Sequence, residues 1–159
     1  LEDAAGGIAA CMPCYLKSHS YGEYVFDHAW ADAYERAGGS YYPKLQVSVP
    51  FTPATGRRLL VRPGPQADAV RGALADSLID ICRRSDASSA HVTFPTRAEW
   101  DLLGSRGFLK RTHQQFHWEN GGYATFDLLR TRAVPFTLDR SHGIDVLVVG
   151  EAVARRASP

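Results

Sequence analysis

The sequence predicts a domain of mixed α/β class, in which helices flank a mixed β-sheet. Two observations carry this prediction. Segments with the alternation of a strand and segments with the periodicity of a helix follow each other along the chain, which is typical of a sheet flanked by helices. Strand-like segments also crowd together between residues 43 and 62, which favours antiparallel hairpins over a purely parallel, doubly wound sheet.

Length and composition are those of one ordinary globular domain. The chain has 159 residues, of which 45% are hydrophobic and 22% are charged, and these values exclude a disordered or fibrous protein. A formal net charge of +1 gives no electrostatic footprint for nucleic acid, and no apolar run approaches the ~20 residues that span a bilayer. Three cysteines are too few for a disulfide-stapled secreted scaffold, so we expect a reduced, cytoplasmic environment.

The first half of the chain contains strand-like segments around one helix. Residues 6–19 are predicted as a strand, in which Pro13 indicates an edge or a bulge. Apolar positions recur at helical spacing over residues 24–37, and a pair of glycines ends that helix. Strict alternation over residues 45–49 predicts a half-buried strand, and a turn leads into a second strand at residues 58–62.

The second half alternates helices with strands. The helix with the clearest apolar stripe runs over residues 68–84, and a strand follows at residues 88–94. Thr96 then caps a short helix that ends near Gly107, with Glu99 in the capping-box position. The remaining predicted elements are strands at residues 108–111 and 113–118 (two strands or one bent one), a turn at residues 120–122 and a strand at residues 144–149.

Three stretches carry a resemblance to a known family. They are Tyr15 to Asp27 with Ala29-Trp30-Ala31, Tyr41 to Leu45 with Val49 to Pro53 and Gly56, and Gln115 to Trp118 with Asn120, Gly122-Tyr123 and Phe126. In this order and spacing they resemble the bacterial family of predicted N-acyltransferases described as peptidoglycan biosynthesis or recognition proteins. That family is grouped with FemAB-type aminoacyl transferases in the GNAT superfamily.

The resemblance implies a GNAT-like fold, with a mixed, largely antiparallel sheet and helices on both faces. Family members are roughly twice as long, with two such halves facing each other across a substrate cleft. We therefore expect residues 1–127 to be one GNAT-like half of a FemAB-type acyltransferase, incomplete relative to the two-half fold. Residues 128–159 do not follow the family pattern and are expected to be a divergent tail, the product of a frameshift or a truncated gene.

The function that the resemblance implies is N-acyl transfer, in which an acyl or aminoacyl group moves to a small-molecule or peptide amine related to the cell wall. The missing half leaves open whether this chain catalyses alone. The acyl donor is also open between acyl-CoA and aminoacyl-tRNA, and a nucleic-acid partner is expected only with the second. GNAT enzymes cradle the CoA pyrophosphate with a glycine-rich loop, but residues 62–67 here contain two prolines, which lack N–H donors.

Two residues are the candidate catalytic groups. His19 and Glu23 are four positions apart and become neighbours if a helix begins at Ser18 or Ser20, so that either serves as the general base. The structural alternative is that Ser20 caps the helix, Glu23 completes a capping box and His19 packs at the end of the strand.

Substrate binding is expected at the aromatic and cationic residues of the three stretches. Lys44 is suited to a phosphate or carboxylate, although a solvated lysine beside core tyrosines explains it equally well. Two histidines of residues 113–117 share a strand face, but no carboxylate or thiol joins them there, so a polar cleft wall is favoured over a metal site. The candidate substrate-binding residues are Lys17, Ser20, Tyr24, Tyr42, Lys44, Gln115, His117 and Trp118.

Two further classes of function compete with the transferase. Cys11-Met12-Pro13-Cys14 has the C-x-P-C form of thiol redox proteins, but a strand places the two cysteines on opposite faces. The other class is a non-catalytic half-domain that binds a ligand or a partner. Such a half-domain exposes the apolar face left by the missing half, and we expect it to self-associate there.

Overall fold

The computed structural model describes the backbone of residues 1–118, 124 and 136–149, and the side chains of residues 1–112 and 124. The predicted turn at residues 120–122 lies outside the described residues. The elements in chain order are β1 (Ala10–Cys11), β2 (Cys14–Lys17), α1 (His28–Arg36), β3 (Lys44–Val47), β4 (Leu60–Val61), α2 (Ala67–Arg84), β5 (Ser89–Thr93), α3 (Arg97–Ser105), β6 (Leu109–Trp118) and β7 (Phe136–Val149).

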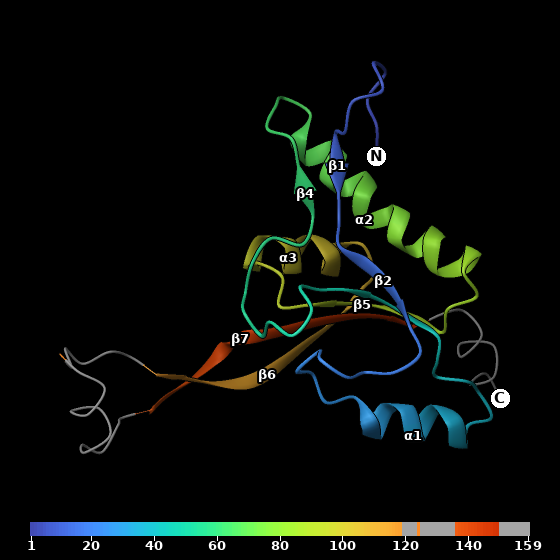
Figure 1. The fold of residues 1–159 in the computed structure, drawn as a ribbon, viewed down its shortest axis with the longest axis vertical. Coiled ribbons are helices and arrows are strands. Elements are labelled where there is room, and N and C mark those ends of the chain that lie inside the picture. Colours follow the sequence, from blue (N-terminus) through green and yellow to red (C-terminus); the bar gives the residue numbers. More distant parts are fainter. Residues whose placement is uncertain (119–123, 125–135, 150–159) are drawn as a thin grey trace.

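The strands form a five-stranded sheet in the order β2-β3-β5-β7-β6 and a two-stranded sheet of β1 and β4. In the larger sheet β3 and β5 pair in parallel, while the other neighbours are antiparallel. In the described part of the chain, α2 and α3 lie on one side of this sheet and α1 lies on the other (Figure 1). The predicted mixed, largely antiparallel sheet with helices on both faces is therefore confirmed.

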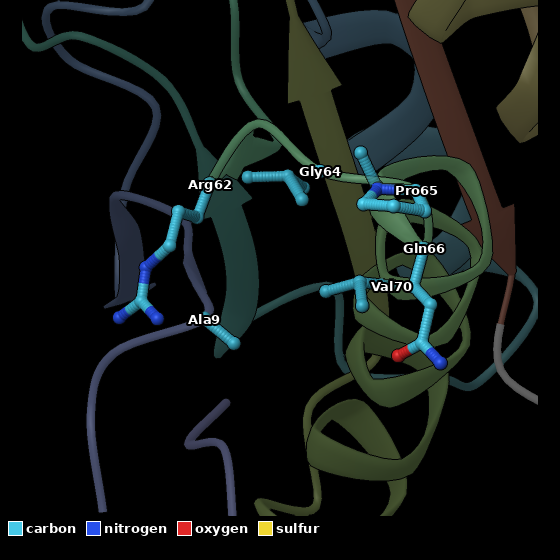
Figure 2. A pocket seen from close by; sticks show the side chains of 8 residues that line it. Ala9, Arg62, Gly64, Pro65, Gln66 and Val70 are labelled. Atoms are coloured by element: carbon cyan, nitrogen blue, oxygen red, sulfur yellow. The ribbon is translucent and has the colours of Figure 1, made fainter.

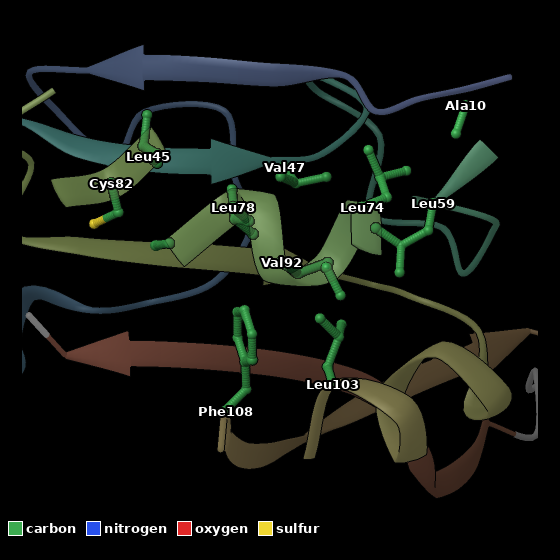
Figure 3. Close-up of a cluster of buried hydrophobic side chains, with 12 residues drawn as sticks. Ala10, Leu45, Val47, Leu59, Leu74, Leu78, Cys82, Val92, Leu103 and Phe108 are labelled. Carbon is green, nitrogen blue, oxygen red and sulfur yellow. The ribbon is translucent and has the colours of Figure 1, made fainter. Parts of the chain in front are cut away.

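The hydrophobic core lies between the large sheet and the pair of helices α2 and α3 (Figure 3). The helix α2 follows its predicted bounds closely, because its apolar stripe packs on the alternate apolar side chains of β3 and β5. The side chains of this core are Ala10, Leu45, Val47, Leu59, Leu74, Ala75, Leu78, Cys82, Ala90, Val92, Leu103 and Phe108.

The predicted capping box of α3 is confirmed and also fastens a distant segment. Thr96 accepts the backbone N–H of Glu99, and the Glu99 carboxylate accepts the backbone N–H of Thr96. The same carboxylate accepts the backbone N–H groups of Arg58 and Leu59 at distances of 2.8–3.1 Å. Glu99 is buried, and its carboxylate tolerates burial because it accepts hydrogen bonds from two segments at once.

The predicted single strand at residues 6–19 is wrong. Pro13 divides it into β1, which pairs with β4, and β2, which pairs with β3 in the other sheet. Proline has no N–H to donate to a ladder, and its carbonyl instead accepts the backbone N–H of Ser48 at 3.3 Å. The second predicted strand, at residues 58–62, shortens to β4 in the small sheet.

The first helix begins later than its apolar spacing predicts. The helix α1 starts at His28, and residues 18–27, which we call the anchored loop, are not helical. Two residues of this loop have left-handed backbone, Gly22 with φ of 80° and Tyr24 with φ of 56°, so a helix cannot pass through it. The predicted end at the paired glycines is confirmed, since Gly38 has φ of 80° two residues after Arg36.

The last strands form a long antiparallel pair. β6 is one continuous strand with an irregularity in register between His113 and Gln115, in agreement with a single bent strand. The predicted strand at residues 144–149 lies within β7, which pairs with β5 on one side and β6 on the other. The division of the chain at residue 127 stays a prediction.

Candidate functional site

The face of the large sheet opposite the core carries buried polar side chains. Lys44 and Gln46 alternate with core residues along β3, and Ser89, His91 and Thr93 do the same along β5. Each is less than 5% exposed, so the predicted half-buried strand is wrong and β3 is buried on both faces. The anchored loop and the tyrosines before β3 supply this cover. Because polar residues are rarely buried without partners, their hydrogen bonds define the site.

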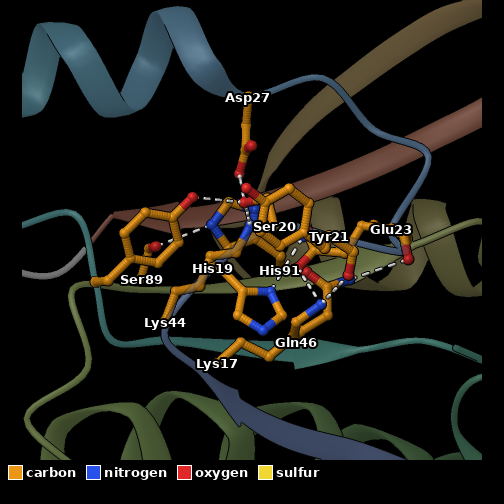
Figure 4. A network of polar contacts seen from close by, with 12 residues as sticks. Lys17, His19, Ser20, Tyr21, Glu23, Asp27, Lys44, Gln46, Ser89 and His91 are labelled. Carbon is orange, nitrogen blue, oxygen red and sulfur yellow. Dashed lines mark hydrogen bonds and ion pairs between the residues drawn. The ribbon is translucent and has the colours of Figure 1, made fainter.

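The Lys44 ammonium lies at the centre of this site (Figure 4). The residues joined around it by hydrogen bonds and ion pairs form what we call the Lys44 cluster: Lys17, Ser20, Glu23, Asp27, Tyr41, Tyr42 and Lys44. It donates to Ser20 Oγ at 2.8 Å, to Glu23 Oε2 at 2.7 Å and to Asp27 Oδ2 at 2.5 Å. These three bonds use all three of its N–H donors. The alternative of a solvated lysine is therefore wrong, since Lys44 is 0% exposed and joins the sheet to the anchored loop.

A second lysine lies at the rim of the cluster. Lys17 Nζ lies 2.9 Å from Glu23 Oε1, an ion pair without the angles of a hydrogen bond, and it donates to the carbonyl oxygen of Tyr21 at 2.8 Å. Two lysines and two carboxylates give the cluster a formal charge of zero. Its charges are thus paired within the chain, which lowers the cost of burying them.

The Asp27 carboxylate receives three hydrogen bonds on the same oxygen. Tyr41 Oη donates at 2.8 Å and Ser20 Oγ at 2.9 Å, beside the bond from Lys44. Burial raises the pKa of Asp27, but the hydrogen bond and positive charge of Lys44, with the two hydroxyl donors, outweigh burial and lower the pKa overall. Asp27 is therefore ionised at neutral pH.

The order of donors around Ser20 sets the orientation of the Tyr42 hydroxyl. Ser20 Oγ lies 2.8 Å from Tyr42 Oη, and its single proton is donated to Asp27. Ser20 Oγ also accepts from Lys44, so Tyr42 must be the donor in the remaining bond. Tyr42 is a half-buried residue, and its oxygen accepts none of these hydrogen bonds.

His91 is a member of the site that the sequence analysis missed. It is 2% exposed, its Nε2 lies 2.9 Å from Ser89 Oγ, and its ring meets Tyr41 edge-on. Burial and the nearby charge of Lys44 lower the pKa of His91 to about 3, so it is neutral at physiological pH. The sequence does hold a signal for this face, because polar residues alternate with apolar ones at positions 89, 91 and 93. In a half-buried strand such residues would face water, whereas here the whole strand is buried.

The candidate catalytic residues do not occupy a helix face. Ser20 does not cap α1, whose N-cap Asp27 makes no side-chain cap bond, so the capping alternative is wrong; Ser20 bonds to Asp27 instead. His19 is exposed and its Nδ1 accepts the backbone N–H of Tyr21 at 3.2 Å. Because Nδ1 accepts this bond, we assign the proton of the neutral ring to Nε2. Nε2 is then a hydrogen-bond donor and has no lone pair with which to act as a base. Glu23 is buried against two lysines.

The other candidate residues are spread over the fold. Tyr24 is 55% exposed on the anchored loop. Gln115, His117 and Trp118 belong to β6, where the register places Gln115 opposite Asp139, but their side chains lie outside the described residues. The side chains that the structure describes include no group of three or more His, Cys, Asp or Glu able to hold a metal ion.

The cysteine pair lacks the features of a redox site. Cys11 lies in β1 and Cys14 in β2, and both are free thiols. Both cysteines lie in strands, as expected, although in two different ones. In redox motifs of this form the first cysteine lies at a helix N-terminus, which lowers its pKa, and Cys11 has no such position. Burial raises the pKa of the Cys14 thiol.

A pocket of about 320 Å³ lies at the N-terminus of α2, beside residues 62–67 (Figure 2). Arg62 on its wall donates to Asp3 Oδ2 at 2.8 Å and to the carbonyl oxygen of Ile8. This cation is therefore paired with the N-terminal segment. The residues that line the pocket are Ala9, Val61, Arg62, Gly64, Pro65, Gln66, Ala67 and Val70.

Comparison with protein families places this chain in a known group. A family model, FemAB_like, described as peptidoglycan biosynthesis/recognition, matches residues 1–131 of the 159. The chain belongs to this FemAB-like family. The resemblance predicted from the sequence is thus confirmed, and the match includes every residue of the Lys44 cluster. The family description suggests a peptidoglycan-related role for the FemAB-like chain. No curated protein matches it.

Within the described residues of this FemAB-like chain, no helix is both long enough and apolar enough to cross a bilayer.

Proposed function

We propose that this FemAB-like chain forms the acceptor side of an N-acyltransferase, which transfers an acyl or aminoacyl group to an amine of a cell-wall precursor. The observation that supports the proposal is the hydrogen-bond order from Tyr42 through Ser20 to Asp27. The ionised, buried carboxylate of Asp27 fixes the Ser20 hydroxyl, which in turn orients the hydroxyl of Tyr42. The lone pairs of Tyr42 then accept an N–H of the incoming amine and hold it for attack.

In the proposed reaction the amine nitrogen attacks the acyl carbonyl carbon. The new C–N bond forms, the bond from that carbon to the sulfur or oxygen of the donor breaks, and the proton of the amine ends on that leaving group. His19 donates from Nε2 to the carbonyl oxygen, and Lys17 binds a carboxylate of a peptide acceptor. Glu23 and Lys44 hold the anchored loop in place.

The remaining assignments follow the sequence analysis. Tyr24, Gln115, His117 and Trp118 are proposed to contact the substrate. Residues 1–127 are proposed to act as one half of a two-half GNAT-like enzyme in the cytoplasm, with acyl-CoA or aminoacyl-tRNA as the donor.

The test is a transfer assay with the full chain. A stem peptide that carries a free lysine amine is incubated with acetyl-CoA or with alanyl-tRNA, and mass spectrometry detects the acylated peptide. Tyr42→Phe removes the oriented hydroxyl and should slow transfer by about tenfold to a hundredfold, the scale of a lost positioning contact. Tyr15→Phe is the matched control, because Tyr15 is an exposed tyrosine of β2 and should leave the rate unchanged. Equal rates for Tyr42→Phe and wild type would contradict the proposal.

A second candidate function is a non-catalytic binding module. It is favoured by the pairing of Lys44, whose three N–H donors are all used inside the chain and leave none for a substrate. A chain that binds the stem peptide but yields no acylated product with either donor would favour this alternative.

A further inference from the structure

The anchored loop buries its charged side chains and exposes its aromatic ones. Glu23 and Asp27 are 4% and 1% exposed, whereas Tyr21, Tyr24 and Phe26 are 77%, 55% and 77% exposed. A loop that served folding alone would bury its rings and leave its charges in water. The reversed pattern therefore places three rings on the surface while the Lys44 cluster fixes the loop from beneath.

A fourth ring joins them from the segment after β3. Phe51 is 72% exposed, and its backbone N–H donates to the carbonyl oxygen of Gly22 at 3.0 Å. A Cβ at Gly22 would lie only 2.7 Å from the Phe51 ring, so glycine is required for this contact. The ring of Phe51 is thus held against the anchored loop. We call Tyr21, Tyr24, Phe26 and Phe51 the aromatic platform.

The platform is maintained against backbone strain. Tyr24 and Phe51 have φ of 56° and 55°, in the left-handed region that disfavours residues with a Cβ. Each such residue costs on the order of 1–2 kcal/mol, and strained backbone of this kind is found at binding and catalytic sites. Strain that keeps two large apolar rings in water is consistent with a surface held ready for a ligand.

Hydrogen-bond donors border the rings. The Lys17 side chain is 17% exposed, donates one N–H to the carbonyl oxygen of Tyr21 and forms an ion pair with Glu23. His19 stacks at a tilt on Tyr21, with ring centroids 5.0 Å apart, and offers its Nε2–H. Rings mixed with exposed donors suit an amphipathic ligand that has an apolar face and a polar rim. A sugar ring has this character, with C–H groups on its faces and oxygens at its edge.

We infer that the aromatic platform binds the glycan part of the acceptor, with N-acetylated sugar rings on the aromatic side chains and their polar edges toward His19. This inference rests on the proposed function for the identity of the acceptor. It adds a recognition surface on the anchored loop, whose Ser20 bonds to Tyr42, the residue proposed to hold the amine.

The test measures binding without any acyl donor. The full chain is titrated with chitotetraose and with muramyl dipeptide, and NMR chemical shifts report the dissociation constants. Phe51→Ala should weaken binding by about tenfold, the effect of losing one stacked ring. Gly22→Ala keeps every ring but displaces Phe51, and it should weaken binding similarly. Ile8→Ala, which removes a 67% exposed side chain of the N-terminal segment, is the control and should bind as wild type does. Circular dichroism confirms that each variant is folded.

Several results would overturn the inference. One is that wild type binds neither sugar, and another is that folded Phe51→Ala and Gly22→Ala bind both as wild type does. Sedimentation could also show dimers that Phe51→Ala dissociates and chitotetraose does not, which would make the platform a protein interface. Transfer to a sugar-free stem peptide separates the two proposals. Transfer without sugar binding would refute the platform alone, and sugar binding without transfer would refute the transferase alone.

Discussion

Replacing Lys44 by methionine tests whether the buried ion cluster holds the anchored loop to the sheet. The substitution keeps most of the side-chain volume but leaves two carboxylates, 4% and 1% exposed, without their shared cation. Breaking a buried pair by removing one partner costs about 3–5 kcal/mol. For a domain of this size that corresponds to a Tm lower by roughly 6–20 °C.

The assay is thermal unfolding monitored by circular dichroism, and a urea titration gives the free energy of unfolding as a second measure. Lys110→Met is the matched control, because Lys110 lies 2.8 Å from Asp101 in an exposed ion pair and should lose no more than about 1 kcal/mol. If Lys44→Met were as stable as wild type while Lys110→Met behaved as expected, the burial of the cluster would have no energetic consequence and the reasoning would be refuted.

The pH dependence of the same variant gives an independent check. The folded-state pKa of Asp27 is lowered below 3.8, so Asp27 stabilises the fold above that pH and the contribution is lost as pH falls through the folded value. Lys44→Met removes the main cause of the lowered pKa. The difference in Tm between wild type and variant should therefore shrink as the pH falls from 7 to 3.

Three further predictions concern other buried groups. Glu99→Gln should destabilise the chain by about 2–3 kcal/mol in urea, because its carboxylate accepts four backbone and hydroxyl donors, whereas Asp101→Asn on the same helix should cost little. His91→Leu should flatten the loss of stability between pH 6.5 and 3, since over this range the unfolded chain binds a proton that the folded chain, with a pKa of about 3 at His91, does not. Iodoacetamide should alkylate exposed Cys11 before Cys14, whose pKa is raised by burial, and mass spectrometry of the digested chain would show the order.

The elements that short-range interactions specify were predictable from the sequence. The helices α2 and α3 follow an apolar stripe and a capping box, both of which involve residues within four positions of each other. The mixed sheet and the family also follow from local segments and their order. Predictions failed where a local pattern had two outcomes, as at residues 18–27, where apolar spacing and a serine suggested a helix start.

The candidate site depended on contacts that local pattern does not encode. Lys44 meets Glu23 and Asp27 across 21 and 17 residues, and Gln46 meets Thr93 across 47. The first two pairs join β3 to the anchored loop, and the third exists because β3 and β5 lie side by side in a particular register. A slip of one residue in β3 would move Lys44 and Gln46 to the opposite face. The sequence by itself determined the helices α2 and α3, the mixed sheet as a class and the family to which the chain belongs. Only the tertiary structure decided that the charges of the anchored loop are buried and its rings exposed, since long-range pairing sets which groups lose their water.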